Sequence, residues 1–175
     1  LTNPNCTLDD ILQIVKGPDF PTGGIVHGYE GLKSAYATGR GKVIIKAKTE
    51  ITTYKGDNRI IITEIPYDVN KSVLLKKMSD VVEQKNVDGV KVIRDETDRQ
   101  GLRIVIDVRK DVNPETILQV LFKYSDLQIS YNYNMVVISY GRPMQMGIID
   151  ILDSYIAHQK EVMTNRCNFD LLRAN

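Results

Sequence analysis

Cysteine and histidine are scarce in this chain of 175 residues, which has two of each. Cys6 and Cys167 lie near opposite ends of the sequence and lack the spacing of a metal-binding pair. We therefore expect free thiols in a reducing compartment. His27 and His158 are isolated from each other and from any cysteine, which favours structural or surface roles over catalysis.

Long apolar runs and targeting signals are also missing. No run approaches the roughly 18 apolar residues of a membrane span, and the N-terminus lacks the pattern of a signal peptide. We expect no membrane partner and a cytoplasmic location. The hydrophobic fraction of 42% and the charged fraction of 26% are typical of globular proteins. The length suits one sizeable core, or one domain with an appendage.

Catalytic and metal-binding patterns are absent as well. Gly23-Gly24 is not followed by the Gly-Lys-Ser/Thr of a nucleotide loop. The carboxylates of the charged turn Arg94–Gly101 match no ligand spacing, and its arginines favour local ion pairing. Neither a nucleophile–base pair nor a carboxylate dyad emerges from the spacing. We assign no catalytic and no metal-binding residue, and we expect no cofactor on this chain.

Positive charge is concentrated in one stretch. Five of the 23 basic residues lie between Lys33 and Lys48, a segment without acidic residues, so the remaining 18 are set against 22 acidic residues. Side chains alternate across a strand, which places Lys42, Lys46 and Lys48 on one face and Val43, Ile45 and Ala47 on the other, buried one.

This arrangement is the electrostatic pattern of a polyanion site. Our candidate contacts are Lys42, Lys46 and Lys48, with Arg40 and Lys71 added from neighbouring turns. A solvated strand face, whose lysines protect a sheet edge, is the alternative explanation.

The order of patterns predicts an α/β (α+β) fold with a mixed sheet and packed helices. The strand Gly39–Lys48 and the Ile-rich run from Arg59 form a hairpin around Lys55–Asn58. Gly23–Val26 is expected to form a short strand or a close-packed loop. Further strands are expected over 87–93, over 102–108 with Arg103 and Asp107 pointing outward, and over 135–140, which a turn at Gly141–Pro143 ends. The segment 127–133 is ambiguous. Helices are expected over 7–16, 29–38 and 70–85 and from Asn113, with caps at Thr7, Asn70 and Asn113.

From Ile148 to Asn175 the pattern predicts one long helix that begins a coiled coil. Its apolar seam, interrupted by Gln159 and Arg166, consists of Ile148, Leu152, Tyr155, Val162 and Phe169. No preceding segment is available to cover the second half. Leu1 is not an initiator Met and Asn175 falls within the helical pattern. We therefore expect a piece of a longer polypeptide whose later part supplies the partner helix.

Several motifs occur in one order along the chain: Gly17–Ile25, Ala37–Lys42, Thr63–Tyr67, Val69–Lys71, Arg94–Thr97, Asn134–Val136 and Gly141–Pro143. Together they resemble one family, the A subunits of bacterial type IIA DNA topoisomerases, gyrase and topoisomerase IV. The run Asp126–Asn132 is more similar to topoisomerase IV than to gyrase.

The resemblance implies that residues 1–22 link from a winged-helix domain, 23–146 form the α/β tower domain, and 147–175 start the coiled-coil arm. It implies duplex DNA as a partner through its backbone, together with B subunits and a second A subunit in an A2B2 enzyme. ATP and Mg²⁺ act through the partner subunit, in a bacterial cytoplasm at the nucleoid.

One departure separates this chain from a complete enzyme. The family nucleophile is a Tyr directly after an Arg, and none of the nine tyrosines here follows an Arg. The resemblance therefore implies a non-catalytic, DNA-supporting segment of an isomerase. Two alternatives stay open: a purely structural spacer that carries the arm, and an RNA-binding α/β domain.

Overall fold

The computed structural model describes residues 3, 5–54, 56–84 and 87–174. It confirms the α+β fold that ends in a long helix. The chain forms two compact units, one of Leu1–Gly17, Gly28–Val43 and Asn132–Asn175, the other of Pro18–His27 and Ile44–Tyr131. Each unit is described by itself.

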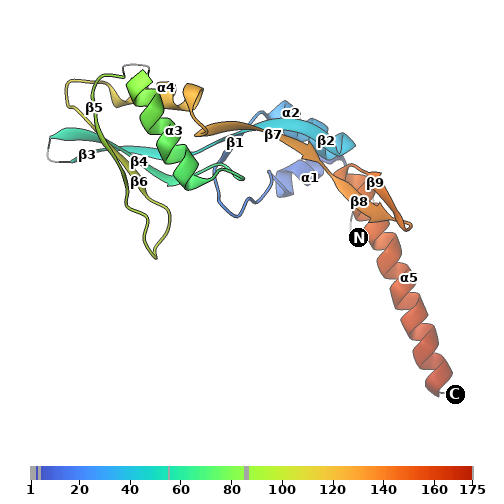
Figure 1. The fold of residues 1–175 in the computed structure, drawn as a ribbon. Helices are drawn as coiled ribbons and strands as arrows, with labels where there is room; N and C mark the ends of the chain where they lie inside the picture. Colours follow the sequence, from blue (N-terminus) through green and yellow to red (C-terminus); the bar gives the residue numbers. More distant parts are fainter. Residues whose placement is uncertain (1–2, 4, 55, 85–86, 175) are drawn as a thin grey trace. The chain divides into compact units, whose positions relative to one another are not determined.

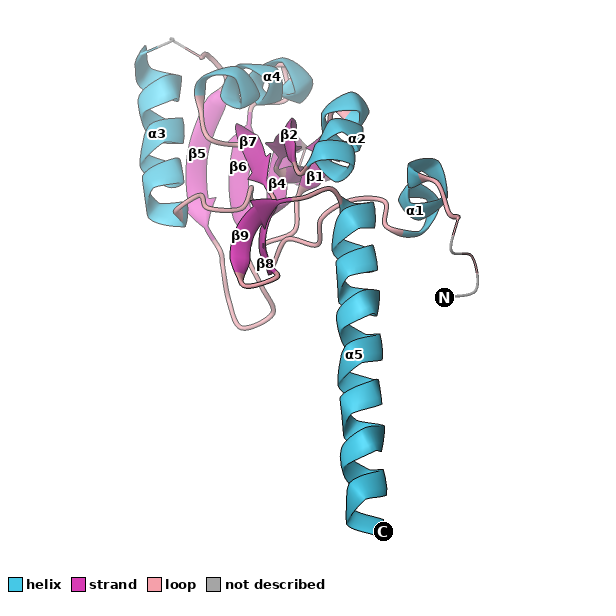
Figure 2. Ribbon diagram, turned by 90° about the vertical axis from the view of Figure 1, so that its right-hand side faces the viewer, coloured by secondary structure: helices cyan, strands magenta, loops and turns pink. Residues whose placement is uncertain are grey.

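The second unit is built on a four-stranded sheet in the order β3-β4-β6-β5, in which every neighbouring pair is antiparallel. The strands are β3 (Lys48–Tyr54), β4 (Asp57–Glu64), β5 (Val90–Asp95) and β6 (Ile104–Val108). Two helices, α3 (Lys71–Gln84) and α4 (Pro114–Tyr124), pack on this sheet (Figures 1 and 2).

The core of this unit lies between the sheet and the two helices. Ile60 pairs with Ile106 and Ile62 with Ile104 across β4 and β6, so all four side chains share one face, and all are fully buried. Leu74 and Met78 of α3, and Ile117 and Leu121 of α4, complete the same cluster. Packing of both helices on one face is the expected result of their apolar stripes.

The opposite face of the sheet was predicted only in part. Arg103 and Asp107 were expected to point outward, but Val105 between them is as deeply buried as Ile104. Val105 pairs with Ile61 on β4 and with Arg94 on β5, whose guanidinium reaches Asp107. Long arginine side chains can cover a small apolar residue with their stems.

The predicted hairpin is wrong in its first arm. The strand from Gly39 ends as β2 (Arg40–Lys46), and the true hairpin partner of β4 is β3. Ala47 donates its backbone N–H to the carbonyl of Leu127 at 2.8 Å, outside the hairpin ladder, and the register shifts at Lys48. Alternating burial continues through this break, and so Val43, Ile45 and Ala47 are buried as predicted. Lys55, in the predicted turn, lies outside the described residues.

β2 belongs instead to a three-stranded sheet in the order β1-β2-β7. Its neighbours are β1 (Ile25–His27) and β7 (Gln128–Asn134), which settles the ambiguous segment at 127–133 as a strand. The boundary between the two units falls within β2 and within β7. Ile25 pairs with Lys46, and His27 pairs with Ile44.

The first unit contains α1 (Leu8–Ile14), α2 (Tyr29–Thr38), the hairpin of β8 (Val136–Ser139) and β9 (Arg142–Gln145), and α5 (Ile148–Ala174). Thr7 and Asp10 form the capping box of α1, which confirms that helix start. Gly39 ends α2 as predicted, in the left-handed region at φ 78°. The strand β9 was not predicted, because Arg142 and Pro143 were expected in a turn.

Two helix starts of the second unit were predicted from capping residues. Asn70 accepts hydrogen bonds from the backbone of Ser72 and Val73, and Asn113 accepts one from Glu115, so both caps are confirmed. The predicted end of the 70–85 helix at Lys85 lies outside the described residues.

The last helix runs as predicted from Ile148 and has no buried residue over its described length. Among the described helices, none is long and apolar enough to cross a membrane.

Candidate functional site

The five candidate cations are distributed over both units and have different surroundings. Arg40 and Lys42 belong to the first unit, whereas Lys46, Lys48 and Lys71 belong to the second. An exposed cation that makes no internal ion pair is the better phosphate contact, because no protein carboxylate competes for its charge. The internal partners of each cation therefore determine how available it is to contact a phosphate.

Lys48 is held by a carboxylate. Its Nζ lies 3.0 Å from Oε1 of Glu64, and Oε2 of Glu64 accepts a hydrogen bond of 2.6 Å from the backbone N–H of Gly24. The bond from Gly24, and then that from Lys48, lower the pKa of Glu64. The ion pair is largely exposed and contributes at most about 1 kcal/mol, but it compensates the charge of Lys48.

Lys71 is compensated in the same way. Its Nζ lies 2.7 Å from Oδ2 of Asp95. Hydrogen bonds from Lys71 and then from Thr97 lower the pKa of Asp95 to about 2. Lys46 is half-buried, with its Nζ 5.6 Å from the ring centroid of Phe122, a cation–π distance. These three lysines thus have partners within their own unit.

Arg40 and Lys42 line a concavity of about 580 Å³ on the first unit. Both residues are exposed, and their side chains lie on the same face of β2 because they are two residues apart. The other lining residues are Gly41, Asn132, Tyr133, Asn134 and Gln145. No acidic residue is among these seven, so two positive charges face a surface of neutral polar groups.

The backbone that carries Arg40 and Lys42 is fixed by close contact with α2. A Cβ atom on Gly31 would collide with the carbonyl oxygen of Lys42, and one on Gly41 would collide with the carbonyl oxygen of Gly31. The hydroxyls of Ser34 and Thr38 donate to the carbonyl of Arg40 at 3.3 and 3.1 Å. Because Gly31 and Gly41 have no side chain, the backbones of α2 and β2 can come into direct contact.

The amide side chains of this concavity were missed in the sequence. Asn132 and Asn134 fell in or beside the ambiguous segment 127–133, and Gln145 lies on the unpredicted strand β9. The alternation Asn-x-Asn within a strand pattern was the available signal, since it places both amides on one face. Nothing in the sequence alone indicated that Gln145 would lie beside them.

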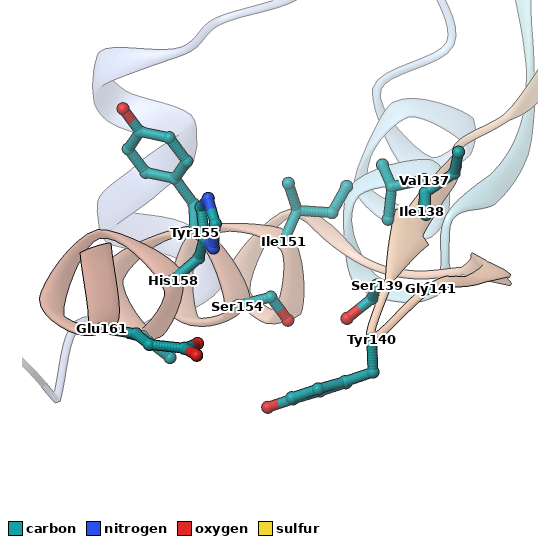
Figure 3. A pocket seen from close by; sticks show the side chains of 11 residues that line it. Val137, Ile138, Ser139, Tyr140, Gly141, Ile151, Ser154, Tyr155, His158 and Glu161 are labelled. Carbon is teal, nitrogen blue, oxygen red and sulfur yellow. The ribbon is translucent and has the colours of Figure 1, made fainter. Parts of the chain in front are cut away.

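A second concavity of about 650 Å³ lies between the β8–β9 hairpin and the first turns of α5. Its lining includes Ser154, His158 and Glu161, residue types of hydrolytic sites. Figure 3 shows the three side chains on the same helix, where their spacing of four and three residues places them along one face, and no hydrogen bond joins them among the described residues. We therefore read no nucleophile–base arrangement from these side chains.

The charged turn after β5 forms the local ion pairs expected of it. Glu96 accepts from Arg94 at 3.1 Å and from Arg103 at 3.2 Å. On the neighbouring strand, Asp107 accepts from Arg59 and Arg94 at 2.8 and 2.6 Å. Burial acts to raise the pKa of Asp107, but the bonds from Arg59 and Arg94 outweigh it and the pKa is lowered. Within the described ranges, no group of three metal-ligating side chains is assembled.

Comparison with known proteins gives one consistent result. A family profile for the A subunit of DNA gyrase/topoisomerase IV matches residues 1–175. The A subunit of DNA topoisomerase 4 from Bacillus subtilis is 52% identical over 172 residues, which is 98% of this chain and 21% of the relative. The proteins of the same name from Staphylococcus aureus and Staphylococcus epidermidis are 54% and 51% identical, over 98% and 99% of this chain and 22% of each relative. The chain thus spans about a fifth of the length of these curated relatives.

Proposed function

Because the chain belongs to the family of DNA gyrase/topoisomerase IV A subunits, we propose that it is a non-catalytic, DNA-supporting segment of such a subunit in a type II topoisomerase. In this proposal residues 23–146 are the tower-like domain, 1–22 its linker, and 147–175 the start of the coiled-coil arm. The segment acts in a bacterial cytoplasm at the nucleoid, within an A2B2 enzyme that passes one duplex through another.

The observation that best supports DNA contact is the concavity of Arg40 and Lys42. A cation beside a phosphate releases counterions, and this contact does not depend on base sequence. Chemistry on DNA would be supplied elsewhere in the assembly, since none of the nine tyrosines here follows an Arg. Mg²⁺ and ATP would act through the partner subunit.

A structural spacer is the second candidate, and a specific observation favours it. Lys48 and Lys71 have carboxylate partners and Lys46 lies at Phe122, so three of the five candidate cations already serve the fold. In this alternative the segment only carries the arm and binds no duplex. An RNA-binding domain, the third possibility, would prefer RNA to duplex DNA.

A salt titration of duplex binding separates these functions. We expect weak, sequence-independent binding, with a dissociation constant of roughly 10⁻⁴ to 10⁻⁶ M at physiological salt. Joint replacement of Lys42, Lys46 and Lys48 by Ala should reduce the slope of log affinity against log salt by up to about 0.9 per lost phosphate contact. Because Lys46 and Lys48 already interact with Phe122 and Glu64, we expect Lys42→Ala alone to account for most of this change in slope.

Lys76→Ala provides a matched control, because Lys76 is exposed on α3 and is not among the residues that line the concavity. An unchanged slope in the triple variant, with its circular dichroism intact, would remove Lys42, Lys46 and Lys48 from the DNA path. Absence of duplex binding by the unmodified chain would favour the spacer. Tighter binding to RNA of the same length would favour the RNA-binding domain.

A further inference from the structure

We propose that the concavity at the start of β2 is a phosphodiester-binding pocket, in which the neutral amides of Asn132, Asn134 and Gln145 bind together with Arg40 and Lys42. The inference rests on the proposed function and adds to it three uncharged binding residues. The ligand is the backbone of a nucleic acid, one phosphodiester of which enters the pocket.

The two asparagines are placed by strand alternation. Asn132 and Asn134 are exposed, whereas Tyr133 between them is half-buried, so both amides lie on the open face of β7. The next residue, Met135, donates its backbone N–H to the carbonyl of Gly39 at 2.8 Å. This bond ties the end of β7 to the residue that directly precedes Arg40.

Gln145 is oriented before any ligand binds. Its Nε2 donates to the carbonyl oxygen of Thr38 at 3.2 Å, and Thr38 in turn bonds the backbone of Arg40 through its hydroxyl. A primary amide has two hydrogens, so a second one remains to donate to a ligand. A pocket rim that is already ordered loses less conformational entropy on binding.

The chemistry of the lining selects a phosphodiester. Two cations supply the attraction, three amides supply up to two donors each, and no carboxylate among the seven lining residues repels an anion. Hydrogen bonds from neutral donors to a charged oxygen are stronger than those between neutral groups. Because amides carry no charge, they add affinity without releasing counterions. Cations and amides therefore leave different signatures in a salt titration.

The first test maps the pocket directly. We would follow the side-chain amide signals of Asn132, Asn134 and Gln145 by nuclear magnetic resonance in the 175-residue chain. The probes are the single-stranded hexamer dT6 and a 12-base-pair duplex. Both should shift these three signals, because both present phosphodiesters. Signals of Asn168 and Gln159, exposed on α5, should stay in place.

The second test separates amides from cations. Joint replacement of Asn132 and Asn134 by Ala should lower duplex affinity at least about tenfold, because each lost hydrogen bond to a charged group alone corresponds to about that factor. The salt slope should stay unchanged. The nearly isosteric Asn132→Asp and Asn134→Asp should lower the affinity further, since a carboxylate replaces a donor. Arg40→Ala should reduce the slope, and Gln159→Ala should change neither quantity.

The outcomes distinguish the pocket from the proposed function. Salt-dependent duplex binding that the alanine pair leaves at full strength would overturn the pocket and leave the function standing. Shifts with dT6 in a chain that binds no duplex would support the pocket and overturn the function. Absence of shifts at the three amides with both probes would also overturn the pocket.

Discussion

At the scale of single residues, the ion pair of Lys71 with Asp95 links a predicted DNA contact to the stability of the fold. The pKa of Asp95 is lowered from its ordinary value of 3.8 to about 2, chiefly by the hydrogen bond from Lys71. A carboxyl whose pKa falls on folding stabilises the native state above its ordinary pKa. We therefore expect this contribution to be complete above pH 3.8 and to be lost as the pH falls toward 2.

The measurement is a carbon-detected titration of the Asp95 carboxyl. Lys71→Ala should move its pKa upward, toward the ordinary value, while Lys76→Ala should leave it in place. Titration of Asp95 near 3.8 in the unmodified chain would contradict the assignment. The same experiment with added duplex asks whether DNA draws Lys71 away, because a phosphate that captured Lys71 would raise the pKa of Asp95.

At the scale of elements, the contact between α2 and β2 reverses the usual effect of an alanine in a helix. Gly→Ala inside a helix normally stabilises by roughly 0.5–1 kcal/mol. At Gly31, however, the new Cβ would meet the carbonyl of Lys42. We expect Gly31→Ala to destabilise by about 1–3 kcal/mol, as overpacking does, and to displace Arg40 and Lys42.

Chemical denaturation measures the free energy of unfolding of this variant. Gly17→Ala outside the helices controls for the added methyl group, since no heavy atom beyond its chain neighbours lies within 4 Å of a Cβ placed there. A Gly31→Ala protein as stable as the unmodified chain would show that helix and strand separate easily. In that case the backbone under the pocket is not fixed.

The helix α5 leads to a prediction about motion. Every described residue from Ala157 to Ala174 is exposed, including Val162 and Phe169 of the apolar seam. Isolated helices are marginal in water without tertiary packing. Amides beyond Val162 should therefore exchange with solvent far faster than that of Ile104 in the sheet. Equal protection at Phe169 and Ile104 in dilute solution would contradict this, and protection that grows with concentration would indicate pairing of two chains.

The sequence largely predicted which segments form helices and strands, but it did not predict which strands pair with each other. Caps and apolar stripes act within a few residues, so Thr7, Asn70 and Asn113 marked helix starts correctly. The break at Ala47 depends on a bond to Leu127, which lies far along the chain, and alternation alone does not reveal it. The residues of the candidate site differ in the same way. Arg40 and Lys42 could be predicted from the concentration of positive charge, but placing Asn134 and Gln145 beside them requires knowing which strands are neighbours.

At the scale of the whole molecule, charge alone does not explain DNA binding. The net charge is only +1, so long-range attraction to a polyanion is small. Binding must then come from local arrangement, and much of the positive charge in the second unit is matched by nearby carboxylates. The acid-free concavity of the first unit differs in this respect, which is why both proposals depend on it.

The sequence context of the tyrosines leads to a prediction about strand cleavage. Strand cleavage by covalent catalysis needs an activated nucleophile positioned with its partners. The family nucleophile is a Tyr directly after an Arg, and that pair is absent from this sequence. We therefore expect that the 175-residue chain, with or without ATP and a relative's B subunit, forms no covalent adduct with supercoiled DNA after denaturant trapping. A full-length A subunit from a relative is the positive control. An adduct with this chain would place a nucleophile among its nine tyrosines and would overturn the non-catalytic role, whereas binding without an adduct is the behaviour of a segment that supports DNA for chemistry performed elsewhere.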